Sequence, residues 1–183
     1  MDNVLPTRRF VEPSVVTSHF LLREGDVVAD FGAGSGFFVE ILSRAVGPQG
    51  VVHALEIQKE LVEKIGDIAR QKGLANVNPK WCDIESLNGT GLPDESLDVA
   101  IMVNTLFQFE DKPTGLREVE RTLHAGGKFI LIDWSESFGG IGPQIDQVLN
   151  KNDARALAEG VGFTFEREFD AGDHHYGLAF RKG

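Results

Sequence analysis

Apolar residues along the chain fall into two patterns, short continuous runs and longer stretches with helical spacing. The continuous runs predict buried strands, which cover Val27–Ala29, Val51–Leu55, Val77–Cys82, Leu97–Val103 and Lys128–Ile132. The stretches with apolar positions three or four residues apart predict helices, which cover Pro13–Leu22, Phe37–Val46, Gln58–Lys72 and Thr114–Leu123. Because strands and helices alternate, we expect an α/β fold with a mostly parallel sheet covered on both faces. Pro79 lies within the third run and places that strand at an edge of the sheet.

The C-terminal part of the chain departs from this alternation. Ser135–Leu149 predicts a long loop, and Asn150 with Asp153 resembles a capping box that opens a helix over Lys151–Gly160. Two strands, Phe163–Phe169 and Tyr176–Arg181, then follow with a short turn between them. That turn is too short for a crossover connection, so the last strand must run antiparallel. We expect one domain over residues 1–183, in which residues 1–12 form an N-terminal arm.

A glycine-dense turn separates the first strand from the helix that follows it. Gly32, Gly34 and Gly36 stand at alternate positions after Asp30. Glycines let the backbone turn sharply and let a ligand approach where a Cβ would clash. The start of the next helix offers unpaired N–H groups and the positive end of the helix dipole. The stretch therefore predicts a site that holds a ligand against the backbone.

Polar side chains also end the predicted parallel strands. Asp30, Glu56, Asp83, Asn104 and Asp133 each follow an apolar run. The carboxyl ends of parallel strands line one crevice, and in open α/β sheets this crevice binds ligands. Strand ends are often polar for solubility alone, but the set together with the glycine turn favours a binding site for hydroxyls, amines or cations.

Composition narrows the class of ligand. The chain has 183 residues and a formal net charge of -10, which argues against a general nucleic-acid binder because that role needs a basic surface. A single cysteine, Cys82, excludes an intrachain disulfide and a thiolate metal cluster. No apolar run is long enough for a membrane span, and the N-terminus lacks the apolar core of a signal peptide. By default we expect a cytoplasmic protein.

The spacing of the glycines identifies a family. A dinucleotide fingerprint needs G-x-G-x-x-G, and counted from Gly32 its third glycine would fall on Phe37. The pattern Asp30-x-Gly32-x-Gly34-x-Gly36 instead resembles the first motif of class I S-adenosylmethionine-dependent methyltransferases. Residues 13–183 resemble that superfamily as a whole, and most closely its small ubiquinone/menaquinone-biosynthesis-like (type 11) members. The resemblance implies a Rossmann-like three-layer sandwich, with a seven-stranded sheet of order 3-2-1-4-5-7-6, and S-adenosylmethionine as the cofactor.

The resemblance also implies a role for each site residue. The glycine loop would pass close to the methionine and ribose parts of the cofactor, and Asp30 would orient that loop or meet the methionine ammonium. Glu56 would accept both ribose hydroxyls, and Asp83 would accept the exocyclic amine of adenine. The full set of implied cofactor residues is Asp30, Gly32, Ala33, Gly34, Gly36, Glu56, Ile57, Asp83, Ile84 and Asn104. Ile57 and Ile84 would pack on the two faces of adenine, and Asn104 would contact the methionyl part.

Methyl transfer is an in-line displacement, so much of the catalysis is alignment and exclusion of water. A general base is needed only if the acceptor must lose a proton early. His174 and His175 begin the antiparallel last strand, at the predicted cofactor edge, and are the candidate catalytic residues; a merely polar hairpin turn is the alternative. His53 and His124 belong to the opposite edge. The histidines show no spacing that indicates a metal site.

The methyl acceptor is the least determined part of the site. We expect a pocket roofed by the N-terminal segment and the loop Trp134–Leu149, with Phe10, His19, Phe20, Trp134 and Phe138 as possible lining. Val103–Leu106 replaces the Asn/Asp-Pro-Pro-Tyr/Phe tetrapeptide of amine methylases after the fourth strand, which by family analogy favours a small-molecule acceptor. Two alternatives stay open: a nicotinamide-dependent oxidoreductase, and a cofactor-binding interaction protein without turnover.

Overall fold

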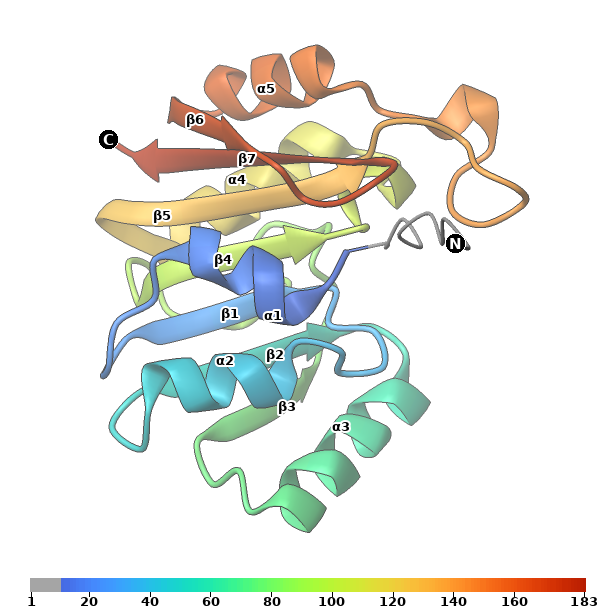
Figure 1. Cartoon of the computed structure of the whole chain (residues 1–183). Helices are drawn as coiled ribbons and strands as arrows, with labels where there is room; N and C mark the ends of the chain where they lie inside the picture. The colour runs from blue at the N-terminus through green and yellow to red at the C-terminus, as the bar shows by residue number, and fades with distance from the viewer. Residues whose placement is uncertain (1–10) are drawn as a thin grey trace, which may run out of the picture.

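The computed structural model describes residues 11–183, and most of the predicted N-terminal arm, with Phe10, lies outside them. Seven strands form one sheet in the order β3-β2-β1-β4-β5-β7-β6, with helices on both of its faces (Figure 1). The strands are β1 Val27–Phe31, β2 Val51–Glu56, β3 Val77–Trp81, β4 Leu97–Val103, β5 Leu123–Trp134, β6 Phe163–Phe169 and β7 His175–Lys182. This order confirms the predicted Rossmann-like sheet.

Only β7 runs against its neighbours. It pairs antiparallel with both β5 and β6, whereas β1 to β5 pair in parallel. The prediction of an antiparallel last strand is therefore confirmed. Pro79 lies in β3, which is an edge strand of the sheet, where the missing N–H of proline is tolerated.

The helices bury one apolar side each against the sheet. The α-helices are α1 Pro13–Val16, α2 Val39–Val46, α3 Lys59–Lys72, α4 Lys112–Thr122 and α5 Lys151–Gly160, and the short 3-10 helices are η1 Thr17–Phe20, η2 Leu106–Gln108 and η3 Ile145–Gln147. Side chains of α1, η1, α2 and α3 join one apolar cluster, and those of α4 and α5 join another on the opposite face. None of the helices in residues 11–183 has the length and hydrophobicity that crossing a bilayer requires.

The helix after the glycine turn begins later than predicted. The sequence pattern placed its start at Phe37, but α2 starts at Val39. Gly34 and Gly36 both have positive φ values, of 54° and 83°, and the turns that they make extend through Phe38. Phe38 is buried, whereas 63% of Phe37 is exposed. An aromatic side chain at the start of the predicted helix is therefore left at the surface.

Other boundaries shifted for local reasons. The predicted helix Pro13–Leu22 divides into α1 and η1 and ends at Phe20, because Leu21 adopts a left-handed conformation with φ 52°. α4 starts at Lys112, two residues early, because Asp111 caps it by accepting the N–H of Thr114. Asn150 caps α5 in the same way, by accepting the N–H groups of Asn152 and Asp153.

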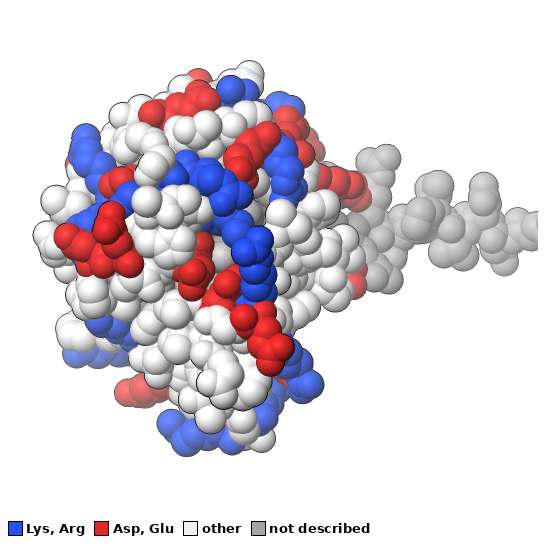
Figure 2. Space-filling view, turned by 90° about the vertical axis from the view of Figure 1, so that its left-hand side faces the viewer, with Lys and Arg blue, Asp and Glu red and all other residues white. Residues whose placement is uncertain are grey.

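Charged side chains of both signs cover the edge formed by the amino ends of the parallel strands (Figure 2). Many of them are paired there: Arg181 with Glu166, Lys182 with Glu120, and His124 with Asp98. Asp98 and a backbone carbonyl raise the pKa of the His124 imidazole, which favours its charged form. The polar strand ends, by contrast, gather at the opposite, carboxyl edge of the sheet.

Candidate active site

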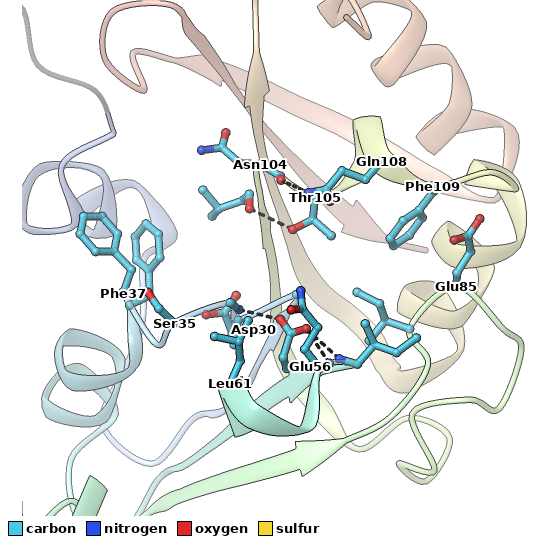
Figure 3. A pocket seen from close by; sticks show the side chains of 18 of the residues that line it. Asp30, Ser35, Phe37, Glu56, Leu61, Glu85, Asn104, Thr105, Gln108 and Phe109 are labelled. Atoms are coloured by element: carbon cyan, nitrogen blue, oxygen red, sulfur yellow. Dashed lines mark hydrogen bonds between the residues drawn. The ribbon is translucent and has the colours of Figure 1, made fainter. Parts of the chain in front are cut away.

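A cleft of about 450 Å³ opens at the carboxyl edge of the sheet. One wall comes from the ends of β1 and β2 and from the residues after β3, and the other comes from the segment that follows β4. Figure 3 shows Asp30 and Glu56 on one side of the cleft, with Asn104, Thr105 and Gln108 across from them. The site therefore joins segments separated by more than seventy residues of sequence.

The glycine loop forms the floor between these walls. Gly32 has φ 84°, and a Cβ added to it would lie 2.6 Å from Oγ1 of Thr105, so only glycine lets the loop pass under the segment after β4. Gly34 has φ 54° and lines the cleft, with no atom within 4 Å of an added Cβ. Its surface is open to a ligand. Gly36 does not line the cleft; an added Cβ there would lie 3.1 Å from Ile65 of α3.

Glu56 is the most fully engaged side chain of the cleft. Its Oε2 accepts the N–H of Gly34 at 2.9 Å, and its Oε1 accepts the N–H groups of Ile57 and Gln58 at 2.9 and 3.0 Å. Only 6% of the residue is exposed. A carboxylate offers about four lone-pair sites, so these three bonds fix its orientation and still leave acceptor capacity.

Asp30 is a buried carboxyl group beside Glu56, with 2% of its surface exposed. Burial, and to a smaller extent the charge of Glu56, raise the pKa of Asp30 to about 7. Charging this group is costly because two carboxylates then face the same enclosed space. A cation bound in the cleft would offset that cost, so the pair is suited to a positively charged ligand.

The residues after β2 and β3 form an apolar slot with a polar end. Ile57 is exposed at the cleft, and its carbonyl accepts the indole N–H of Trp81 at 2.8 Å. Asp83 accepts the N–H of Glu85 at 3.0 Å and the hydroxyl of Ser86 at 2.6 Å. Ile84 is buried and also lines the cleft. A flat ring with a polar edge fits between such groups.

The opposite wall holds an unpaired polar atom. Asn104 adopts a left-handed conformation with φ 54°, and its Oδ1 is buried without a hydrogen-bond partner among the described residues. The carbonyl of the same residue accepts from Nε2 of Gln108 at 2.8 Å. An unpaired buried acceptor is costly unless a ligand supplies a donor. Asn104 lines the cleft, but its Oδ1 is enclosed, so the side chain must turn before a ligand can donate to it.

The two candidate histidines lie at the same edge but outside this cleft. His175 is buried and packs on Trp134, with ring centroids 4.2 Å apart. Its Nδ1 lies 2.9 Å from the carbonyl of Asp173, and its Nε2 is buried without a partner in the described chain. His174 contacts Glu136 at 2.6 Å and stacks on Phe138.

Burial lowers the pKa of His175, and the neighbouring His174 acts in the same direction, against the carbonyl of Asp173. The imidazole is therefore neutral near pH 7. Since Nδ1 must donate to the carbonyl, Nε2 carries a free lone pair. Such a nitrogen can accept a proton.

Of the ten predicted cofactor residues, all but Gly36 line the cleft. The structure adds residues that the sequence pattern did not indicate, namely Ser35, Phe37, Phe38, Gln58, Leu61, Glu85, Val103, Thr105, Gln108 and Phe109. Most of them follow a predicted strand end by one to five residues, which was the available signal. Within residues 11–183, no group of three or more His, Cys, Asp or Glu side chains is placed to hold a metal ion.

Comparisons with known proteins agree with this geometry. Residues 22–170 match the family model described as a methyltransferase domain. The chain is 31% identical over 126 residues to the 2-phytyl-1,4-naphtoquinone methyltransferase of Synechococcus elongatus, covering 69% of this chain and 53% of that protein. It is 31% identical over 116 residues to the ubiquinone/menaquinone biosynthesis C-methyltransferase UbiE of Pasteurella multocida, covering 63% and 42%. The chain spans about half the length of these relatives.

A solved structure extends the likeness to almost the whole chain. The SAM-dependent methyltransferase of Aquifex aeolicus superposes with a TM-score of 0.86 at 26% identity, covering 95% of this chain and 91% of that one. These comparisons indicate S-adenosylmethionine, not a nicotinamide, as the cofactor of the cleft. With a family model that covers most of its length and a sheet order to match, the chain belongs to the methyltransferase-domain family.

Proposed function

We propose that this protein transfers a methyl group from S-adenosylmethionine to a small-molecule acceptor. The observation that carries the proposal is the carboxylate of Glu56, fixed by three backbone N–H groups at the floor of the cleft. It provides a preorganised acceptor for the two ribose hydroxyls. The open surface of Gly34 fits the methionine part beside it.

When bound, S-adenosylmethionine supplies an electrophilic methyl group on a sulfonium. In this proposal, Asp30 offsets the positive charge, Asn104 accepts from the ammonium, and Ile57 and Ile84 enclose adenine while Asp83 accepts its amine. Gly32, Ala33 and Gly34 bring the backbone close to the ligand, and Gly36 gives the loop its turn. The chain's contribution is thus to orient the methyl group and to exclude water.

The acceptor that best fits the end of the cleft at Phe37 is planar, apolar and uncharged. Phe37 and Phe38 line the cleft, and Figure 3 shows Phe37 at one end of it and Phe109 at the opposite end, near Glu85. No Lys or Arg lines it. One relative is named for a naphthoquinone, and another is named for ubiquinone and menaquinone biosynthesis. We therefore propose a quinol-like ring as the acceptor, methylated at carbon or oxygen.

A turnover assay tests this function. The protein is incubated with S-adenosylmethionine and 1,4-naphthohydroquinone, or with a panel of phenols and quinols, and S-adenosylhomocysteine is quantified. The proposal predicts product formation that depends on both the protein and the acceptor. Tight cofactor binding without product across the panel would instead favour the interaction protein without turnover. Stabilisation by NADH but not by S-adenosylhomocysteine would favour the oxidoreductase.

We propose that His175 is the general base for the acceptor, with His174 supporting the hairpin beside it; because Nε2 is buried outside the cleft, the acceptor must extend to the start of β7 and the imidazole must become accessible when it binds. Replacing His175 with Ala is expected to lower turnover at least tenfold, within the usual range for loss of a general base. Cofactor affinity should change less than threefold, as measured by titration calorimetry. His124→Ala, at the opposite edge of the sheet, is the matched control. Unchanged turnover in His175→Ala with a confirmed acceptor would remove His175 from the mechanism.

The net charge of the chain bears on the kind of partner that it binds. A formal net charge of -10 supports a partner that is a small molecule and not a nucleic acid. We propose the cytoplasm as its location.

A further inference from the structure

Glu118 is a charged residue of α4 that lies away from the cleft. Its side chain is completely buried. Its carboxylate accepts the N–H of Asn88 at 2.7 Å and the N–H of Thr90 at 3.1 Å, and it also accepts the Thr90 hydroxyl. Arg121, one turn along the helix, donates to it from Nε at 2.9 Å and from Nη2 at 2.7 Å. The loop after β3 is thus fastened to α4 by one carboxylate.

The fastened loop begins with the residues that line the adenine side of the cleft. Asp83, Ile84 and Glu85 lie at its start, and Glu85 accepts the N–H of Asp111 at the N-cap of α4. At Gly89 the chain folds back so closely that an added Cβ would lie 2.0 Å from the carbonyl oxygen of Asp83. Displacement of Asn88–Thr90 would therefore be transmitted directly to Asp83.

The groups around Glu118 favour the ionised form of its carboxyl. Burial alone would raise the pKa of the Glu118 carboxyl, but the bonds from Arg121, Thr90 and the backbone N–H groups outweigh it and hold the pKa below its usual range. Arg121 is itself held by Asp94 and donates to the Leu92 carbonyl at 3.0 Å. The charged form of Glu118 therefore organises both ends of the segment 88–94.

We propose that Glu118 is a positioning residue for cofactor selectivity, which sets the place of Asp83 at the adenine edge by holding the loop 83–92. This inference rests on the proposed function, because it assumes that adenine binds beside Asp83. Glu118 touches neither cofactor nor acceptor.

The test compares two ligands that differ only at the adenine edge. S-adenosylhomocysteine carries the exocyclic amine and an acceptor at N1, and S-inosylhomocysteine carries a carbonyl oxygen in place of the amine and a proton on N1. The ratio of their dissociation constants, measured by titration calorimetry, reports the bond to Asp83. Because a donor is replaced by an acceptor facing a carboxylate, the wild-type protein is expected to prefer the adenine ligand by about tenfold or more.

Three variants separate positioning from stability. Thr90→Val keeps the side-chain shape and removes the hydroxyl, with its bond to Glu118 and the bonds that it accepts from Leu92 and Arg121. Glu118→Gln removes the charge. Both are expected to bring the ratio at least threefold closer to one. The control is Thr122→Val, which loses a buried hydroxyl bonded to the carbonyls of Glu118 and Val119 within α4 but does not touch the loop. It should keep the wild-type ratio even if its melting temperature falls as far as that of Thr90→Val.

Each outcome decides the inference. A wild-type ratio in Thr90→Val overturns it, even if Glu118→Gln fails to fold, and so does an equal change in Thr122→Val. Asp83→Ala serves as the reference: it should abolish the preference outright. If the wild-type protein binds neither ligand, the proposed function itself fails. If it binds both but Asp83→Ala keeps the preference, adenine does not lie beside Asp83 and the inference is overturned while cofactor binding stands.

Discussion

Replacing Asp30 with Asn is expected to stabilise the ligand-free protein above pH 7 while weakening its hold on S-adenosylmethionine. The first effect follows from the pKa of Asp30, which burial raises from 3.8 to about 7. In the unfolded chain the carboxyl loses its proton near its ordinary pKa, whereas in the fold it keeps the proton up to about pH 7. Folding therefore binds a proton between these values, and stability falls as the pH rises through that window.

Above pH 7 the full cost of the buried charge is present, and Asn removes it. The expected gain at pH 8 is of the order of 2–4 kcal/mol, from a shift of about three pKa units. Chemical denaturation at pH 5 and pH 8 measures it: the variant should gain clearly more at pH 8 than at pH 5, where only part of the cost has developed. Burial also raises the pKa of Asp133 to about 7, so only the difference between variant and wild type reports on Asp30.

The second effect has the opposite sign because the cofactor is a cation. Binding a positive charge beside Asp30 favours its ionised form, so the wild-type protein should release protons on binding near pH 7. Its affinity should rise between pH 6 and pH 8. Calorimetry in two buffers of different ionisation enthalpy detects the released protons. In Asp30→Asn both the release and the pH dependence should diminish; a variant with the wild-type slope would show that the charge lies elsewhere.

Replacing Glu56 with Ala is expected to produce the largest loss of cofactor affinity, about 1.5–3 kcal/mol or roughly 10- to 150-fold. The variant loses the acceptor for the ribose hydroxyls and also frees the three N–H groups, of Gly34, Ile57 and Gln58, that the carboxylate orders. Titration calorimetry with S-adenosylhomocysteine gives the magnitude. Glu60→Ala, which removes an exposed carboxylate from the first turn of α3, is the matched control and should bind normally.

Ribose analogues show whether the loss arises at the hydroxyls. For the wild-type protein, 2′-deoxy and 3′-deoxy forms of S-adenosylhomocysteine should each bind less tightly than the parent ligand. In Glu56→Ala that penalty should shrink, because the missing hydroxyl had already lost its partner. If the deoxy ligands lose as much affinity in Glu56→Ala as in the wild-type protein, a group other than Glu56 binds the ribose hydroxyls.

The sheet and the floor of the cleft were predictable from the sequence because they follow from local rules. Apolar runs located the parallel strands, and the residue after each run had to lie at one edge. That rule alone brought Asp30, Glu56, Asp83 and Asn104 together before their contacts were known. The spacing of glycines then separated the methyl-donor loop from a dinucleotide loop, since Phe37 stands where the latter needs glycine.

The remaining features depend on contacts between distant parts of the chain. Helical spacing made Phe37 the first residue of a helix, but turns at two glycines with positive φ leave it outside α2, exposed at the mouth of the cleft. In the sequence, Glu118 resembles any charged residue of an amphipathic helix. In the structure, the loop after β3 covers it and donates to its carboxylate. Thr105 and Gln108 sit on a short 3-10 turn that carries no periodic signal. Hydrophobic periodicity and motif spacing in one sequence do not reveal such contacts between residues far apart along the chain.

The two tryptophans give the protein its own optical probes. The chain contains only Trp81 and Trp134. Trp81 is 58% exposed and bonded to Ile57 at the adenine end, whereas Trp134 is 6% exposed beneath His175 at the other. Their emission should differ in colour and in quenching by iodide. In a variant with one tryptophan replaced by Phe, the fluorescence of the remaining tryptophan would report on one end of the site alone. Stopped-flow fluorescence could then measure the binding rates of cofactor and acceptor separately, without an added label.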